Sequence, residues 1–176
     1  MDSNQTLRRE LGELGMTEDS FRALALLPMI EVAWADREIQ AAERKVILEI
    51  AQGHDLLNPS SRDLLKSWLT VRPSAEYFQR SRELLVKLAH RNQGLGHDLP
   101  SDSLDAVLTF CSHVAEAAGG VFGVMMTVSS SERSAMKKIA QAIDEESVKH
   151  RDLTEGIVGH TIGVEWQNLL DEFGED

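Results

Sequence analysis

Cysteine is nearly absent from this chain: Cys111 is the only one among 176 residues. A single cysteine excludes an internal disulfide framework, and it excludes a zinc or iron–sulfur site built from cysteines alone. Aromatic residues make up only 5% of the chain, whereas hydrophobic residues as a whole reach 42%, so aliphatic side chains and alanine must form the core. Because strands favour aromatic and β-branched residues, this composition favours helices over sheets.

Basic residues are also scarce relative to acidic ones. Lysine and arginine number 18, aspartate and glutamate number 29, and the net charge is −11. Nucleic acids and anionic lipids both require a basic surface, so we expect no binding to nucleic acid. The apolar stretch 23–35 is too short to cross a bilayer and contains Glu31, so no transmembrane segment is expected. The polar N-terminus lacks the features of a targeting signal, and the sequence predicts a cytoplasmic protein.

Apolar residues recur at helical spacing along almost the whole chain. The helices predicted from this spacing cover residues 7–15, 17–35, 41–52, 59–69, 73–89, 101 or 103 to 115, 129–143 and 166–173. Loops are expected over 92–100 and 145–163, and no run of alternating residues indicates a strand. The predicted fold class is therefore all-α, a bundle of about seven to eight helices in a single domain over 1–176.

Three local details follow from the same spacing. Pro28 lies inside the second predicted helix and should kink it. The third helix should bury Ala42, Val46 and Ile50. In the seventh, Ser129 and Glu132 have the spacing of a capping box, in which each side chain bonds the backbone N–H of the other.

An internal repeat relates two parts of the chain. Residues 43–52 align with residues 132–141 at an offset of 89, and five of the ten positions are identical. Upstream, residues 31–33 resemble residues 116–118 at an offset of 85. Two helix–loop–helix halves, about 20–55 and 104–145, would then bring their acidic loops together.

The first of these loops resembles part of a calcium-binding motif. Asp36, Glu38, Ile39 and Glu43 follow the back half of an EF-hand. The first two ligand positions of such a motif would fall on Val32 and Trp34, neither of which can bind calcium. The loop is therefore not an EF-hand.

The run from Ala35 to Glu43, which follows an apolar helix and precedes Val46, Ile47 and Ile50, resembles the signature of the tellurite-resistance TerB-like family. The family pattern is Ala, Asp, Gly, an acidic residue, Ile, and a Glu four positions later. Here Arg37 stands where the family usually has Gly, and Gly120 takes the Asp position of the second copy. The resemblance is clearest over 25–50, weaker over 105–145, and implies an all-helical duplicated core with acidic residues that bind metal ions.

The resemblance implies a non-catalytic stress-response module of tellurite-resistance type. The acidic residues near the two loops, which we take as candidate metal ligands, are Glu31, Asp36, Glu38, Glu43, Glu116 and Glu132. Their oxygen atoms suit a divalent ion such as calcium, magnesium or manganese, and zinc is a further candidate cofactor. In the absence of a metal, crowded carboxylates raise one another's pKa unless a cation such as Arg37 offsets them.

Two other functions are consistent with the sequence. In the first, the acids only cap helices, and the protein is an adaptor whose apolar loop 121–128 binds a protein partner or a second copy in a homodimer. In the second, Asp36 and the glutamates hold the metal of a hydrolase. The sequence contains no G-x-x-x-x-G-K, G-x-S-x-G or H-E-x-x-H motif, so we predict that the protein is not an enzyme.

Overall fold

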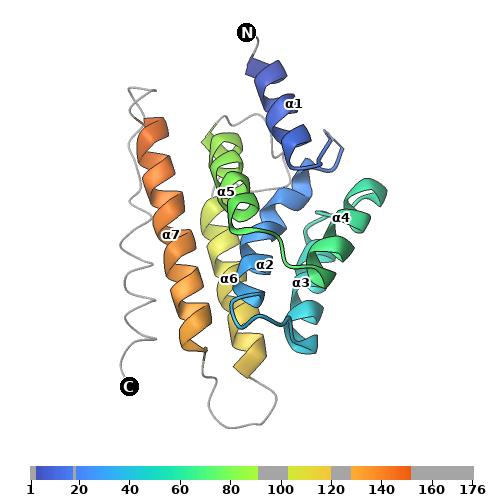
Figure 1. Cartoon of the computed structure of the whole chain (residues 1–176), viewed down its shortest axis with the longest axis vertical. Helices are drawn as coiled ribbons and strands as arrows, with labels where there is room; N and C mark the ends of the chain where they lie inside the picture. Colours follow the sequence, from blue (N-terminus) through green and yellow to red (C-terminus); the bar gives the residue numbers. More distant parts are fainter. Residues whose placement is uncertain (1–2, 18, 91–102, 120–127, 152–176) are drawn as a thin grey trace.

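A computed structural model describes residues 3–17, 19–90, 103–119 and 128–151 of the chain (Figure 1). Within these ranges every regular element is a helix and no strand occurs, which confirms the all-α fold class. The elements are α1 (Ser3–Glu13), the 3-10 helix η1 (Phe21–Leu26), α2 (Leu27–Ala33), α3 (Ala41–Gly53), α4 (Pro59–Thr70), α5 (Ala75–His90), α6 (Ser103–Gly119) and α7 (Ser130–Arg151). The arrangement in two related halves stays a prediction.

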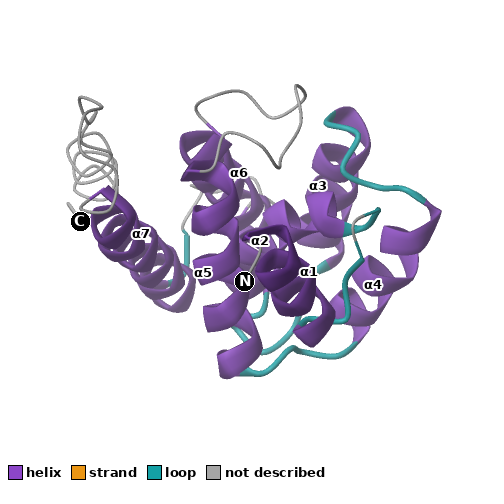
Figure 2. Ribbon diagram, turned by 90° about the horizontal axis from the view of Figure 1, so that it is seen from above, coloured by secondary structure: helices purple, strands orange, loops and turns teal. Residues whose placement is uncertain are grey.

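The short helix α2 lies at the centre of the bundle (Figure 2). It packs against α3, α5, α6 and α7, and the 3-10 helix η1 precedes it directly. Every residue from Ala23 to Ala33 is buried except Glu31. A helix that is apolar on all sides must be covered on all sides, and this explains why the most hydrophobic stretch became the central element.

The other helices cover α2 from two sides. The long helix α7 packs against α5 and α6 at one side of the molecule, whereas α3 and α4 lie at the other (Figure 1). Helix α6 contacts both α3 and α7. The apolar residues that recur at helical spacing along α6 are all buried, as that spacing predicts: Leu104, Val107, Leu108, Cys111 and Ala115. No helix among the described residues has the length and apolar character needed to cross a membrane.

The prediction of one continuous α-helix over 17–35 is wrong. The Thr17 N–H donates to Ser20 Oγ at 2.9 Å, and the chain then winds as the 3-10 helix η1 before α2 begins. Pro28 does not kink a long helix but lies in the first turn of α2. In the first turn of an α-helix the backbone N–H groups have no intrahelical acceptor, so a proline there removes no hydrogen bond. Pro28 therefore starts the helix and does not interrupt it.

Two further predictions about helices need correction. The residues that α3 buries are Glu43, Ile47 and Ala51, one position after the predicted face, because the start of the helix turns Glu43 inward. The loop predicted from 145 instead continues α7 as far as Arg151. Its polar residues are good helix formers, and polarity alone does not end a helix. Predictions for 92–100, 121–127 and 166–173 lie outside the described residues.

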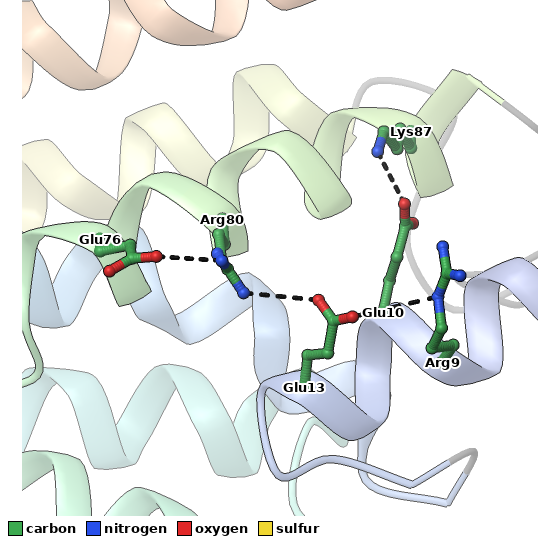
Figure 3. A network of polar contacts seen from close by, with 6 residues as sticks. All are labelled: Arg9, Glu10, Glu13, Glu76, Arg80 and Lys87. Atoms are coloured by element: carbon green, nitrogen blue, oxygen red, sulfur yellow. Dashed lines mark hydrogen bonds and ion pairs between the residues drawn. The ribbon is translucent and has the colours of Figure 1, made fainter.

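Polar contacts attach α1 to α5 (Figure 3). Lys87 Nζ lies 3.0 Å from Glu10, and Arg80 lies 3.4 Å from Glu13 and 3.0 Å from Glu76. The Tyr77 hydroxyl donates to the Leu14 carbonyl at 2.8 Å. These contacts place α1 over the end of the bundle opposite the acidic loops, where it takes no part in the site described below.

Candidate functional site

Two glutamates are buried at the starts of α3 and α7. Glu43 and Glu132 each expose only 2% of their surface. The Gln40 N–H donates to Glu43 Oε2 at 2.6 Å, and the Ser129 N–H donates to Glu132 Oε2 at 2.7 Å. The Glu132 N–H in turn donates to Ser129 Oγ at 3.2 Å, which confirms the predicted capping box. Both carboxylates therefore satisfy a backbone donor that a helix start leaves without a partner.

A hydrogen bond joins the two loops. The Ser129 hydroxyl donates to Asp36 Oδ1 at 3.2 Å, although the two residues are 93 positions apart in the sequence. This contact brings the turn between α2 and α3 to the start of α7. Asp36, Glu43 and Glu132 thus interact electrostatically with one another. We refer to these three residues as the acidic cluster.

The repeat extends to the residue after each buried glutamate. Arg44 donates from its guanidinium to the carbonyl of Leu69 at 3.0 Å, and Arg133 donates to the carbonyl of Val128 at 3.2 Å. Each helix therefore begins with a buried glutamate bonded to its cap residue and an arginine bonded to a backbone carbonyl. The two arginines bond to carbonyls in different places: that of Leu69 near the end of α4, and that of Val128 directly before the cap residue of α7.

Burial raises the pKa of both buried glutamates. Removal from water raises the pKa of Glu43 to about 7, the Gln40 N–H opposes this rise, and the charges of Glu132 and Asp36 add to it. The pKa of Glu132 is also raised, mainly by burial and further by Asp36, while its hydrogen bonds with Ser129 oppose the rise. Mutual repulsion of the carboxylates, as predicted, is present, but desolvation is the larger cause.

One oxygen in the acidic cluster has no partner among the described residues. Glu132 Oε1 is buried and accepts no hydrogen bond, while Oε2 of the same carboxylate is bonded to Ser129. A buried carboxylate oxygen without a donor is unfavourable by roughly 1–3 kcal/mol or more. A proton or a cation at this oxygen would remove that cost.

The other predicted ligands have different surroundings. Glu31 forms a hydrogen-bonded ion pair with Arg82 on α5, and burial nevertheless raises its pKa. Glu116 accepts a hydrogen bond from Ser112 at 3.4 Å, one turn earlier on α6. Glu38 is exposed. The structure thus brings three of the six predicted residues together.

Arg37 does not act as the neutralising cation. It is exposed, and no ion pair joins it to a carboxylate in the described part of the chain. Its φ angle is +73°, in the left-handed region that glycine adopts most readily. Glycine would adopt this backbone with less strain than arginine does.

Sequence reasoning did not identify Gln40 or the contact between Ser129 and Asp36. Gln40 lies three positions before Glu43, which is the capping-box spacing, but glutamine is not among the preferred cap residues. The repeat was the available signal, because it aligns Gln40 with Ser129. The contact between Ser129 and Asp36 depends on how two loops that are distant in the sequence pack together, so no local sequence pattern could predict it.

The acidic cluster is not arranged as a preformed metal site. Among the described residues, no group of three or more histidine, cysteine, aspartate or glutamate side chains is placed so that it could hold a metal ion. A hard divalent ion would have free carboxylate oxygens of Glu132 and Asp36 available, together with water. The donors fit such an ion chemically, and binding would require the side chains to move closer together.

Comparisons with known proteins add no further information. No protein-family model, no curated protein and no solved structure matches this chain.

Proposed function

We propose that this protein is a non-catalytic, TerB-like stress-response module that binds a divalent cation at Asp36, Glu43 and Glu132. The observation that carries the proposal is the buried Glu132 Oε1, which has no hydrogen-bond partner in the described part of the chain. The raised pKa values of both buried glutamates also support it, because a cation would stabilise the ionised form that burial disfavours. The sequence between Ala35 and Glu43 supports the family assignment.

Binding should be weak. Calcium takes six to eight oxygen ligands, and one oxygen of each buried glutamate is already bonded to a backbone N–H. The positive ends of the α3 and α7 dipoles also oppose a cation. A dissociation constant of about 1 mM would still stabilise the folded state by about 1.4 kcal/mol at 10 mM ion.

Thermal unfolding with and without metal tests the proposal. The wild-type protein is melted at pH 7.5 with calcium, magnesium, manganese or zinc, after treatment with a chelator. We expect at least one ion to raise the Tm by about 4 °C at 10 mM. The Glu43→Gln/Glu132→Gln variant should lose this increase, because the amides keep the shape and the capping acceptor but not the charge.

A matched control separates the acidic cluster from general effects of charge. Glu49 lies on α3 and is exposed, so Glu49→Gln removes one carboxylate charge from α3 without touching the buried glutamates. This variant should respond to the ion as the wild type does. An equal loss of the response in both variants, or no response in the wild type, would contradict the proposal.

The adaptor function predicted from the sequence differs in one measurable respect. If the glutamates only cap helices, the wild type will not respond to ions, and Glu43→Gln/Glu132→Gln will remain folded because the amide oxygens still accept the two N–H groups. The two functions therefore differ in what occupies the buried Glu132 Oε1. In the adaptor this oxygen carries a proton, and in the metal-binding module it binds a cation.

A further inference from the structure

A groove lies between α3 and α4, away from the acidic cluster. It encloses about 500 Å³, which is within the range of ligand-binding clefts. Its apolar lining consists of Ala51, Leu65 and Leu69, which are buried, and Leu48 and Leu57, which are partly buried. A groove of this kind between two helices can hold the apolar face of a third helix.

Three basic residues also line the groove, in a protein with a net charge of −11. Arg62 and Lys66 are exposed, and Arg44 is held in place by its bond to the Leu69 carbonyl. None of the three forms an ion pair with a described carboxylate. The one acidic residue of the lining, Asp55, lies 3.5 Å from Arg22 and is already paired. The groove therefore combines an apolar floor with positive charge that is not paired with any carboxylate in the described part of the chain.

The end of this chain has the complementary pattern. After Arg151 the sequence contains no lysine or arginine. Apolar residues at 166, 169, 170 and 173 have the spacing of one helical face, and acidic residues occur at 165, 171, 172, 175 and 176. An acidic helix with one apolar face matches a basic groove with an apolar floor.

We propose that residues 164–176 bind in the groove between α3 and α4 of the same molecule. Trp166, Leu169, Leu170 and Phe173 contact the leucines of the floor, and the acidic residues contact Arg44, Arg62 and Lys66. The linker 152–163 has 12 residues and can extend to about 40 Å. A domain of about 130 residues has a radius of gyration of about 14 Å and measures about 36 Å across, so the reach of the linker is comparable to the width of the domain. The tether also supplies a high effective concentration.

Zero-length cross-linking of the full chain tests this proposal. A carbodiimide joins a carboxylate to an amine only where the two are in contact, and Lys66 is the amine in the groove. We expect cross-links from Lys66 to Asp171, Glu172, Glu175 or Asp176 and none from Lys45, which is exposed elsewhere on α3. Lys66→Arg should abolish the cross-link but keep the charge. Cross-links that Lys45 and Lys66 form equally, or the absence of any from Lys66, would overturn the proposal.

Hydrogen exchange measures binding without depending on the amine. In Arg62→Glu/Lys66→Glu, amides of 164–176 should exchange about tenfold faster than in the wild type. In Lys45→Glu and Lys66→Arg they should exchange as in the wild type. Both groove positions are exposed, so the variant should fold, as far-UV circular dichroism will verify. Unchanged exchange in the groove variant would refute the proposal.

A mixture of isotope-labelled and unlabelled protein identifies the source of the segment. We expect the Lys66 cross-links to join peptides of the same label. Cross-links that join labelled to unlabelled peptides would show that a second copy occupies the groove, and the intramolecular proposal would be wrong.

Discussion

Arg37 adopts a left-handed backbone, with φ at +73°, in the turn that carries Asp36. A residue with a Cβ atom is disfavoured there by roughly 1 kcal/mol relative to glycine, and the exposed Arg37 side chain makes no ion pair with a described carboxylate that would compensate. Arg37→Gly should therefore raise the free energy of unfolding by about 0.5–1 kcal/mol, as measured by urea denaturation.

The opposite substitution at a comparable position serves as the control for Arg37→Gly. Gly15 has φ at +71°, and an added Cβ would meet no atom within 4 Å. Gly15→Ala should therefore lower the free energy of unfolding by about 1 kcal/mol through the backbone alone. If Arg37→Gly also lowers it, the arginine side chain makes a contribution that outweighs the strain.

The pH dependence of stability should report the burial of Glu43. The pKa of Glu43 is about 7 in the folded state, whereas an ordinary glutamate carboxyl has a pKa of 4.5, so the folded state binds more protons than the unfolded state between these pH values. The free energy of unfolding should therefore fall as pH rises from about 4.5 to 7, by up to about 3 kcal/mol, and then level off. In Glu43→Gln this decrease should be clearly smaller, as urea denaturation at pH 5, 6, 7 and 8 will measure.

Two comparisons make the effect of pH specific to Glu43. Glu49→Gln, which alters an exposed carboxylate, should retain the pH dependence of the wild type. A bound divalent ion should recover part of the lost stability at pH 8 but little at pH 5, because protons compete with the ion for the carboxylates. If the free energy of unfolding depends on pH in the same way in the wild type and in Glu43→Gln, the pKa of Glu43 is not raised in the folded state, and this prediction is wrong.

At the scale of elements, the end of α4 is held by side chains from other helices. The last carbonyls of a helix have no intrahelical donor. The Trp34 indole Nε1 donates to the Trp68 carbonyl at 2.8 Å, and Arg44 donates to the next carbonyl, that of Leu69. These bonds link the end of α4 to the loop after α2 and to the start of α3, next to the acidic cluster.

Removing one of these donors should loosen α4. Trp34→Phe keeps an aromatic ring but leaves the Trp68 carbonyl without its donor, so we expect a loss of about 1–2 kcal/mol in urea denaturation. Val71→Ala, in an exposed residue directly after α4, should have almost no effect. If the two variants prove equally stable, the indole bond does not contribute.

At the scale of the molecule, the central position of α2 predicts cooperative unfolding. Helix α2 packs against α3 as well as against α5, α6 and α7, so neither predicted half can separate without exposing it. In a Trp166→Phe variant, fluorescence would report only Trp34 and Trp68, while circular dichroism reports all helices. The two urea transitions should coincide. Two separate transitions would mean that the halves fold independently.

The features that depend on neighbouring residues could be predicted from the amino-acid sequence. Helical spacing predicted α3 and α4 closely, and it identified the buried face of α6, because an amphipathic stripe is a local property. It also identified the Ser129–Glu132 capping box, whose two bonds lie within one turn. The repeat aligned Glu43 with Glu132, and both glutamates are buried at the start of a helix.

Which acidic residues contact one another depends on how distant parts of the chain pack together. Asp36 contacts Ser129 across 93 positions, while Glu31 binds Arg82 on α5 and Glu116 binds Ser112. The buried face of α3 and the groove between α3 and α4 were likewise decided by packing. Burial and charge interactions depend on distances between residues that are far apart in the sequence, and a periodic pattern carries no information about those distances.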